Sequence, residues 1–172
     1  MSAKGKEPSA RMEDSRFEEL YDAYARDVLR VSYFYLRDRD KAEDVTQDVF
    51  MKLLVTCPVL EPGKEKSWLL KVALNRCRDL WRSAWLKRVT LGIEKVDREK
   101  APDRTDEFLE REELLDAIGR LSPDMRSVVL LHYYQGLGVS EIAAMLDLPE
   151  GTVSSRLSRS RSRLAVLLKE RE

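Results

Sequence analysis

One stretch decides the fold of this chain's C-terminal half: GVSEIAAMLDLPEGTVSSRLSRSRSRL, residues Gly138–Leu164. Its first part has the spacing of a short helix that buries Ile142, Ala143 and Leu146, and the small Ala143 permits a close helix crossing. A tight connection follows at residues 147–150. The next helix turns one apolar face inward through Val153, Leu157, Leu164 and Leu168. A short helix, a tight turn and a second helix in this order predict a helix-turn-helix.

The second helix also carries a polar face made of hydroxyl and guanidinium groups. Arginine can donate two hydrogen bonds to one guanine, whereas serine fits between base edges or binds phosphate. A C-terminal helix with a merely solvated arginine face is the alternative. The coincidence of the turn, the small residue and the polar face favours DNA binding through Ser154, Ser155, Arg156, Ser158, Arg159, Arg161 and Arg163.

The composition favours an all-α protein. Charged residues make up 36% of the 172 residues, with only 7 glycines and 6 prolines, and the apolar residues recur at helical spacing with no convincing strand. Residues 86–105 are charge-dense with little periodicity and read as a flexible linker. We therefore expect an N-terminal tail (1–14) and two small helical domains (15–85 and 106–172), the second holding the helix-turn-helix.

Several classes of protein are excluded by what the chain lacks. It has no apolar run of about 20 residues that could span a membrane and no secretory signal, so we expect no membrane insertion and a cytoplasmic location. Two cysteines (Cys57 and Cys77) and one histidine (His132) form no metal motif, and we interpret all three as structural, with a redox-sensitive thiol as the alternative for the cysteines. Without a nucleophile–base pair or a glycine-rich phosphate loop, we expect no enzyme activity, cofactor, metal or small-molecule substrate.

The formal net charge of zero conceals segregated charge. Residues 13–52 hold eleven acids and seven bases (net −4), whereas residues 64–88 hold eight bases and two acids (net +6). Residues 149–172 hold six bases and three acids (net +3). Two basic blocks and one acidic block suggest two contacts with a polyanion and one separate partner surface, although charge runs can also simply aid solubility.

Five segments together resemble the extracytoplasmic-function (ECF) class of bacterial sigma factors. The C-terminal segments LSPDMR, EIA and GTVSSRLSRSRSRL, which begin at Leu121, Glu141 and Gly151, are similar to the family's domain for the minus-thirty-five promoter element. The N-terminal segments RDRDKAEDVTQDVFMKL and SWLLKVALNRCRDLWR, which begin at Arg37 and Ser67, resemble its polymerase-docking and promoter-melting helices. Such resemblance implies a factor that directs core RNA polymerase to promoter DNA.

The resemblance implies a polymerase-docking surface on the acidic helix. Asp44, Gln47, Asp48 and Met51 share a helical face opposite the expected core residues Ala42, Val45, Val49 and Leu53. An acidic rim around apolar side chains suits a basic, partly apolar partner. An ordinary exposed acidic face is the alternative that spacing alone leaves open. The expected polymerase contacts are Asp44, Gln47, Asp48, Phe50 and Met51.

A minus-ten surface is implied for the third helix, which we expect from about Ser67 with Leu69, Val72, Ala73 and Leu80 inward. Asn75 and the loop at residues 57–66 would take up a flipped base, whose edge an amide can read with both a donor and an acceptor. Asp79 and Arg82 could pair on the surface. Trp68, Trp81 and Trp85 are candidates for stacking on bases, although packing favours a core role for Trp68. The expected DNA contacts are Lys64, Lys66, Lys71, Asn75, Arg78 and Arg82.

Two other classes of protein remain as alternatives. A stand-alone helix-turn-helix regulator would bind operator duplex without polymerase, and a helical adaptor would bind only proteins. The regulator leaves the acidic helix and the basic third helix unexplained, and the adaptor leaves the serine–arginine face unexplained. Because the chain has no sensor domain, the resemblance also implies a dedicated anti-sigma protein, which could be linked to a membrane.

Overall fold

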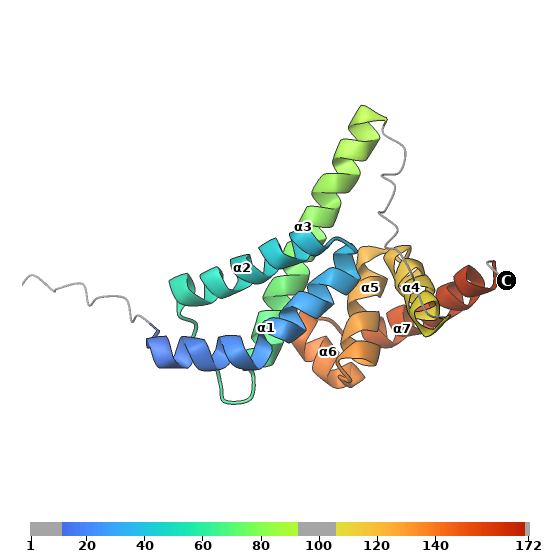
Figure 1. Ribbon diagram of the computed structural model, residues 1–172. Coiled ribbons are helices and arrows are strands. Elements are labelled where there is room, and N and C mark those ends of the chain that lie inside the picture. Colours follow the sequence, from blue (N-terminus) through green and yellow to red (C-terminus); the bar gives the residue numbers. More distant parts are fainter. Residues whose placement is uncertain (1–11, 93–105, 171–172) are drawn as a thin grey trace, which may run out of the picture.

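The computed structural model describes residues 12–92 and 106–170, with side chains in the second range described from residue 111. Within these ranges every regular element is a helix, as expected (Figure 1). The elements are α1 (Asp14–Leu36), α2 (Arg39–Thr56), α3 (Glu65–Leu91), α4 (Asp106–Gly119), α5 (Pro123–Val129), the π-helix η1 (Leu130–Tyr134), α6 (Val139–Leu146) and α7 (Glu150–Lys169).

Helices α1, α2 and α3 form the N-terminal half around a shared apolar core. Arg37 ends α1 in the left-handed conformation, and the side chain of Asp38 then caps α2 by accepting a hydrogen bond from the backbone N–H of Lys41 at 3.0 Å. The four core residues expected from α2 are all fully buried. This sharp corner lets α2 fold back along α1, so that the acidic face of α2 points outward.

Helix α3 differs from the expected segment at both ends. It begins at Glu65 and continues to Leu91, so residues 86–91 are helical although we expected the linker to start at 86. Leucine, lysine and arginine in this last part are good helix formers, and Gly92 (φ 62°) allows the helix to end. The end of α3 projects from the body of the molecule (Figure 1). The remaining linker residues, 93–105, lie outside the described residues, as do residues 1–11.

The interior-facing residues of α3 and α7 were predicted only in part. Val72 and Leu80 are half-buried, whereas Leu70, Leu74 and Cys77 are buried in their place. In α7, Leu167 is buried and Leu168 is not, because the inward stripe runs through Val153, Leu157, Ser160, Leu164 and Leu167. The hydroxyl of buried Ser160 satisfies itself by donating to the Arg156 carbonyl at 2.7 Å. A serine inside the stripe is what shifted the predicted register.

The C-terminal half consists of α4–α7 with the expected turns. Ser122 caps α5, its hydroxyl oxygen accepting from the backbone N–H of Met125, and Pro123 occupies the first turn. Asp147 adopts φ 54° in the turn between α6 and α7, and Glu141 caps α6 by accepting from Gly138 N–H at 2.7 Å. Helices α6 and α7 thus form the predicted helix-turn-helix.

The two halves pack against each other through a partly buried interface. The guanidinium of Arg37 pairs with Glu112 at 2.6 Å, and buried Arg126 donates to the carbonyl oxygen of Tyr35 at 2.8 Å. The ring of Phe34 lies edge-on to Tyr134, with centroids 4.8 Å apart. These contacts join the C-terminal end of α1 to α4, α5 and η1. The halves therefore form a closed arrangement.

Candidate nucleic-acid and protein interfaces

The polar face of α7 begins directly after the turn, on the first three turns of the helix. Ser154, Ser158 and Arg159 are exposed, as are Arg161 and Arg163. The other two predicted residues are only partly exposed. Ser155 is half-buried and donates its hydroxyl to the carbonyl of Thr152 at 3.0 Å, and Arg156 pairs with Asp124 of α5 at 3.2 Å. Five of the seven predicted side chains are thus open to a ligand.

The π-helix η1 adds an aromatic side chain that the sequence reasoning missed. Tyr133 is 55% exposed, and Arg161 of α7 donates a hydrogen bond to its hydroxyl oxygen at 3.3 Å. His132 is half-buried with Nδ1 2.8 Å from the carbonyl oxygen of Leu137, which agrees with its interpretation as structural. The sequence gives little indication of this pairing, because Tyr133 and Arg161 meet only through the packing of η1 beside α7.

The predicted minus-ten residues lie along α3, but several are held by acidic side chains. Lys66 pairs with Asp27 of α1 at 2.9 Å, Lys71 with Asp147 at 2.5 Å and Arg78 with Asp124 at 3.2 Å. Lys64, Asn75 and Arg82 are exposed. Asp79 is exposed as well, and the described structure holds no ion pair between it and Arg82.

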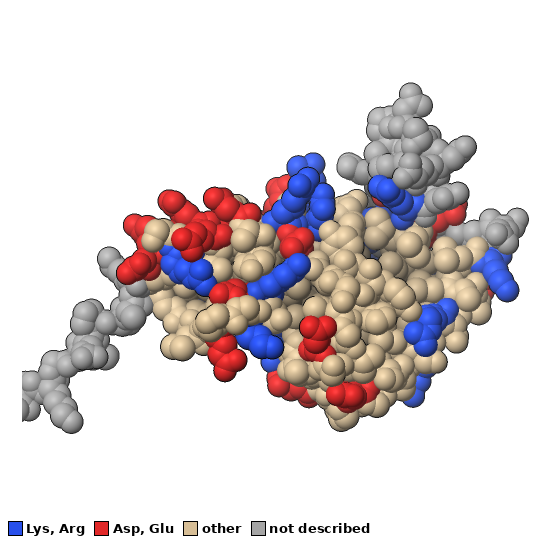
Figure 2. Space-filling view, turned by 90° about the horizontal axis from the view of Figure 1, so that it is seen from below, with Lys and Arg blue, Asp and Glu red and all other residues tan. Residues whose placement is uncertain are grey.

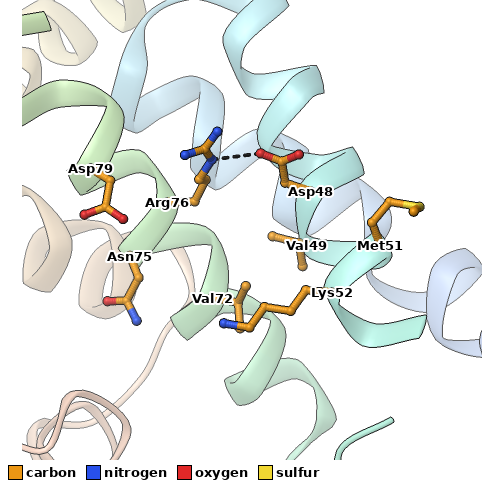
Figure 3. Close-up of a pocket in the computed structure, with 8 residues that line it drawn as sticks. All are labelled: Asp48, Val49, Met51, Lys52, Val72, Asn75, Arg76 and Asp79. Atoms are coloured by element: carbon orange, nitrogen blue, oxygen red, sulfur yellow. Dashed lines mark hydrogen bonds and ion pairs between the residues drawn. The ribbon is translucent and has the colours of Figure 1, made fainter. Parts of the chain in front are cut away.

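An open groove of about 280 Å³ runs between α2 and α3 beside Asn75 (Figure 3). Arg76 crosses it to pair with Asp48 at 2.8 Å, and Asn75 and Asp79 lie next to each other along α3. Because an amide and a carboxylate stand one helical turn apart at its edge, the groove offers both donors and acceptors for hydrogen bonds. Its lining residues are Asp48, Val49, Met51, Lys52, Val72, Asn75, Arg76 and Asp79.

The predicted docking surface on α2 is exposed except at one residue. Asp44, Gln47 and Asp48 reach solvent, and Met51 is 58% exposed. Phe50 is only 3% exposed because its ring packs against Phe17 and Tyr21 of α1, with the Tyr21 centroid 4.8 Å away. The prediction that Phe50 lies on the surface is wrong: its side chain packs beneath that surface, against α1.

The same face continues past Met51 with apolar side chains that the sequence reasoning did not include. Val55 is 78% exposed and Leu54 is 38% exposed. Their three- and four-residue spacing from Met51 could have revealed them. This predicted docking surface, called the docking surface below, is therefore acidic at one end and apolar at the other; its residues are Asp44, Gln47, Asp48, Met51, Leu54 and Val55.

The three tryptophans of α3 have different surroundings. Trp68 and Trp81 are half-buried and pack against the core, whereas Trp85 is 48% exposed on the projecting end of the helix. Trp85 is therefore the tryptophan most open to an external ligand.

The two cysteines differ in accessibility: Cys77 is buried and Cys57 is half-buried. Burial raises the pKa of the Cys77 thiol to about 12, so it stays protonated at neutral pH. Cys57 is half-buried at the end of α2, where its sulfur accepts from the backbone N–H of Met12 at 3.1 Å. Among the described residues there is no group of acidic, histidine or cysteine side chains suited to a metal ion, and no helix long and apolar enough to cross a membrane.

Charge is distributed unevenly over the surface. In Figure 2 acidic side chains gather at the α1 end of the molecule, whereas the α7 end carries mainly lysine and arginine. This separation follows the blocks read from the sequence. The two ends of the molecule therefore suit partners of different charge.

Comparison with known proteins identifies both halves. The family model for Sigma-70 region 2 matches residues 20–87, and the model for Sigma-70 region 4 matches residues 111–164. The first match runs from Leu20 in α1 to Lys87 in α3, and the second from Arg111 in α4 to Leu164 in α7. The order of the two regions is the order expected from the sequence.

Individual relatives agree with these matches. The ECF RNA polymerase sigma factor SigL of Mycobacterium tuberculosis is 30% identical over 166 residues, which cover 94% of each chain. The ECF sigma factor BldN of Streptomyces coelicolor is 32% identical over 162 residues, covering 91% of this chain and 61% of BldN. The chain thus spans about three fifths of the length of BldN.

A solved structure supports the fold of both halves together. The sigma factor RpoE of Bartonella quintana, in complex with the anti-sigma factor NepR, has a TM-score of 0.74 at 26% identity. The match covers 89% of this chain and 96% of that one. Two family regions in order, a near-full-length relative and a common fold lead to one conclusion: this chain belongs to the ECF family of RNA polymerase sigma factors.

Proposed function

We propose that this chain binds core RNA polymerase and directs it to promoters that carry a minus-ten and a minus-thirty-five element. Residues 15–85 would act on the polymerase and the minus-ten element, and residues 106–172 on the minus-thirty-five element. As a sigma factor the chain is an initiation factor and not an enzyme. We place its action in the cytoplasm, where polymerase and chromosome meet.

The exposed start of α7 is the observation that carries this proposal. Ser154, Ser158 and Arg159 stand free on the first turns of a helix that follows the turn of a helix-turn-helix. Such a helix enters the major groove with its N-terminal residues against base edges. Arg159 can bind guanine through two hydrogen bonds, and the serines are short enough to let the helix approach closely. Arg161 and Arg163, farther along, suit phosphates.

At the minus-ten element the groove beside Asn75 supports capture of an unpaired base. The Asn75 amide can both donate to and accept from a base edge. Asp79 adds a carboxylate, which accepts hydrogen bonds but donates none. Its charge would repel the phosphates of DNA unless the DNA supplied a hydrogen-bond donor to it. The exocyclic amino groups of cytosine, adenine and guanine are such donors, and thymine has none. We therefore assign Asp79 to base selection beside Asn75.

The docking surface on α2 suits a polymerase surface that is basic at one end and apolar at the other. The acids Asp44 and Asp48 would meet the basic part, and Met51 and Val55 the apolar part. Asp48 is partly engaged with Arg76, which lines the groove. Polymerase docking and base capture would therefore share one ion pair, between α2 and α3.

Control by an anti-sigma protein is part of the proposal. The solved relative RpoE is held by the anti-sigma factor NepR, and it shares the fold of nearly all of this chain. The uncovered docking and DNA surfaces are what an inhibitor would need to cover. Isolation of the native protein from cells tests this: recovery with a stoichiometric protein partner supports control by an inhibitor, and recovery always alone or with polymerase contradicts it.

Run-off transcription from fragmented genomic DNA tests the proposed function. Purified core polymerase and this chain, as the only added factor, should give discrete transcripts whose upstream regions share two elements. A stand-alone operator-binding regulator, the alternative, would bind duplex tightly without polymerase and give no transcripts. Absence of transcripts together with failure to co-migrate with polymerase would reject the sigma-factor function.

A further inference from the structure

One carboxylate connects the two DNA surfaces of the chain. Asp124, in the first turn of α5, contacts Arg78 of α3 through Oδ1 and Arg156 of α7 through Oδ2, each at 3.2 Å. Arg78 belongs to the proposed minus-ten surface and Arg156 to the minus-thirty-five surface. Asp124 therefore holds one residue of each surface at the same point.

A second acid makes a similar contact close by. Asp147, in the turn of the helix-turn-helix, pairs with Lys71 of α3 at 2.5 Å. Carboxylates and phosphates bind guanidinium and ammonium groups in the same way, by charge-assisted hydrogen bonds. In the closed arrangement Asp124 and Asp147 thus occupy positions that phosphates would take at Lys71, Arg78 and Arg156.

In this closed arrangement the chain cannot bind both promoter elements at once. Elements centred ten and thirty-five base pairs before the start are about 25 base pairs apart, which is about 85 Å along duplex DNA. Arg78 and Arg156 touch the same side chain. The two surfaces cannot reach both elements until the halves separate, so the pairs that join the halves, Asp124 with Arg78 and Asp147 with Lys71, must break first.

The contacts between the halves differ in how easily water or phosphate can replace them. The side chains of Arg37 and Arg126 are buried. That of Arg37, which pairs with Glu112, is only 5% exposed. The pairs at the DNA surfaces are open to solvent, with Asp147 78% and Asp124 49% exposed. Solvent-exposed pairs are weak and sensitive to salt. Arg78 also keeps a buried Nε–H without a hydrogen-bond acceptor, which a phosphate could satisfy.

We propose that Asp124 and Asp147 form an internal latch that keeps the free chain closed and lowers its affinity for DNA until polymerase or promoter separates the halves. The proposal rests on the proposed promoter-binding function. It gives a structural reason for a sigma factor to bind DNA poorly by itself. In this latch, two acidic residues of the C-terminal half pair with basic residues of both halves.

The test uses the full chain without polymerase. The latch variant carries Asp124→Asn and Asp147→Asn, because asparagine also tolerates the helix start and the left-handed backbone at these positions. The control carries Asp22→Asn and Glu113→Gln, which remove equal charge at exposed sites outside the DNA surfaces. Affinity for a labelled 30-base-pair duplex of arbitrary sequence, and the radius of gyration from X-ray scattering, are measured for each.

The latch variant should bind duplex about three- to tenfold more tightly than the control, the change expected from losing three partly exposed ion pairs. Its radius of gyration should rise above that of the wild type, and the control should match the wild type. Equal affinity and equal scattering for the two variants would overturn the latch. Tighter binding at an unchanged radius would overturn it too, since the acids would then only repel DNA locally.

Failure of the proposed function gives a different result. Wild-type chain that supports no transcription with core polymerase would reject the sigma-factor function, whatever the scattering shows. A latch variant that stays closed, in a protein that does support transcription, would reject the latch alone.

Discussion

Substitution of Arg159 can distinguish a contact that reads the promoter sequence from one that only adds affinity for DNA. It is exposed near the start of α7, and no ion pair in the described part of the chain engages it. The change Arg159→Ala should cost about 1–3 kcal/mol at one upstream base pair if the guanidinium reads a base edge. Transcription from promoters varied at each position measures this. An equal loss on every sequence would show that Arg159 contacts phosphate instead.

Asp79 tests base selection in the groove between α2 and α3. If its carboxylate accepts from an exocyclic amino group, Asp79→Ala should reduce the preference for an amino-bearing base over thymine at one minus-ten position by about tenfold, on the order of 1–3 kcal/mol. Transcription from minus-ten variants measures it, with Asp22→Ala, at an exposed position of α1 outside the DNA surfaces, as a control. An unchanged preference with uniformly better binding would mean that Asp79 only repels phosphates.

Cys77 gives a prediction about reactivity. Its pKa is raised to about 12 because burial disfavours the thiolate, which is the reactive form. In the folded chain at pH 8, a thiol-specific reagent should label Cys57 and spare Cys77, and both should react after denaturation in urea. Rapid labelling of Cys77 in the folded state would contradict its burial. Mass spectrometry of the labelled peptides distinguishes the two.

At the scale of the element, the docking surface depends on which acids of α2 are free. Asp48 is paired with Arg76, so reversing its charge would also place two cations together in the groove. Asp44 is exposed with no such pair in the described structure, and Asp44→Lys is the cleaner change. It should abolish or severely weaken co-migration with core polymerase, because a cation would face a basic surface.

Asp22→Lys on α1 is the matched control, since it makes the same reversal on an exposed position outside the docking surface. The melting temperature of both variants should stay near that of the wild type, because neither residue is buried. Asp44→Lys protein that co-migrates normally with polymerase would remove α2 from the proposed docking surface.

At the scale of the whole molecule, Arg126 connects the halves. Its guanidinium is buried and donates to the carbonyls of Tyr35, Gly119 and Leu121, with the Tyr35 ring 4.8 Å away. The change Arg126→Ala leaves buried carbonyls without donors and should lower the free energy of unfolding by about 2–4 kcal/mol. Urea denaturation measures this, and Arg120→Ala, an exposed position, should change it little. A loss no larger than that of Arg120→Ala would contradict the role.

The element scale also shows where the sequence was sufficient. The inward stripe of α2 and the helix-turn-helix were predicted because local spacing alone reports them. Ser160 concealed the register of α7, since a buried serine that bonds within its own helix looks polar in the sequence. The end of α3 was placed six residues early because charge density alone does not stop a helix when most of its residues, here leucine, lysine and arginine, are good helix formers.

The sequence by itself determined the helices, the helix-turn-helix, the segregation of charge and the family resemblance, because each depends on residue types at short spacing. Only the tertiary structure decided that Phe50 lies beneath the docking surface and that Asp124 bridges Arg78 and Arg156. Those facts join residues from separate helices, up to 78 positions apart in the last case. Such meetings follow from how the helices pack, which no local pattern encodes.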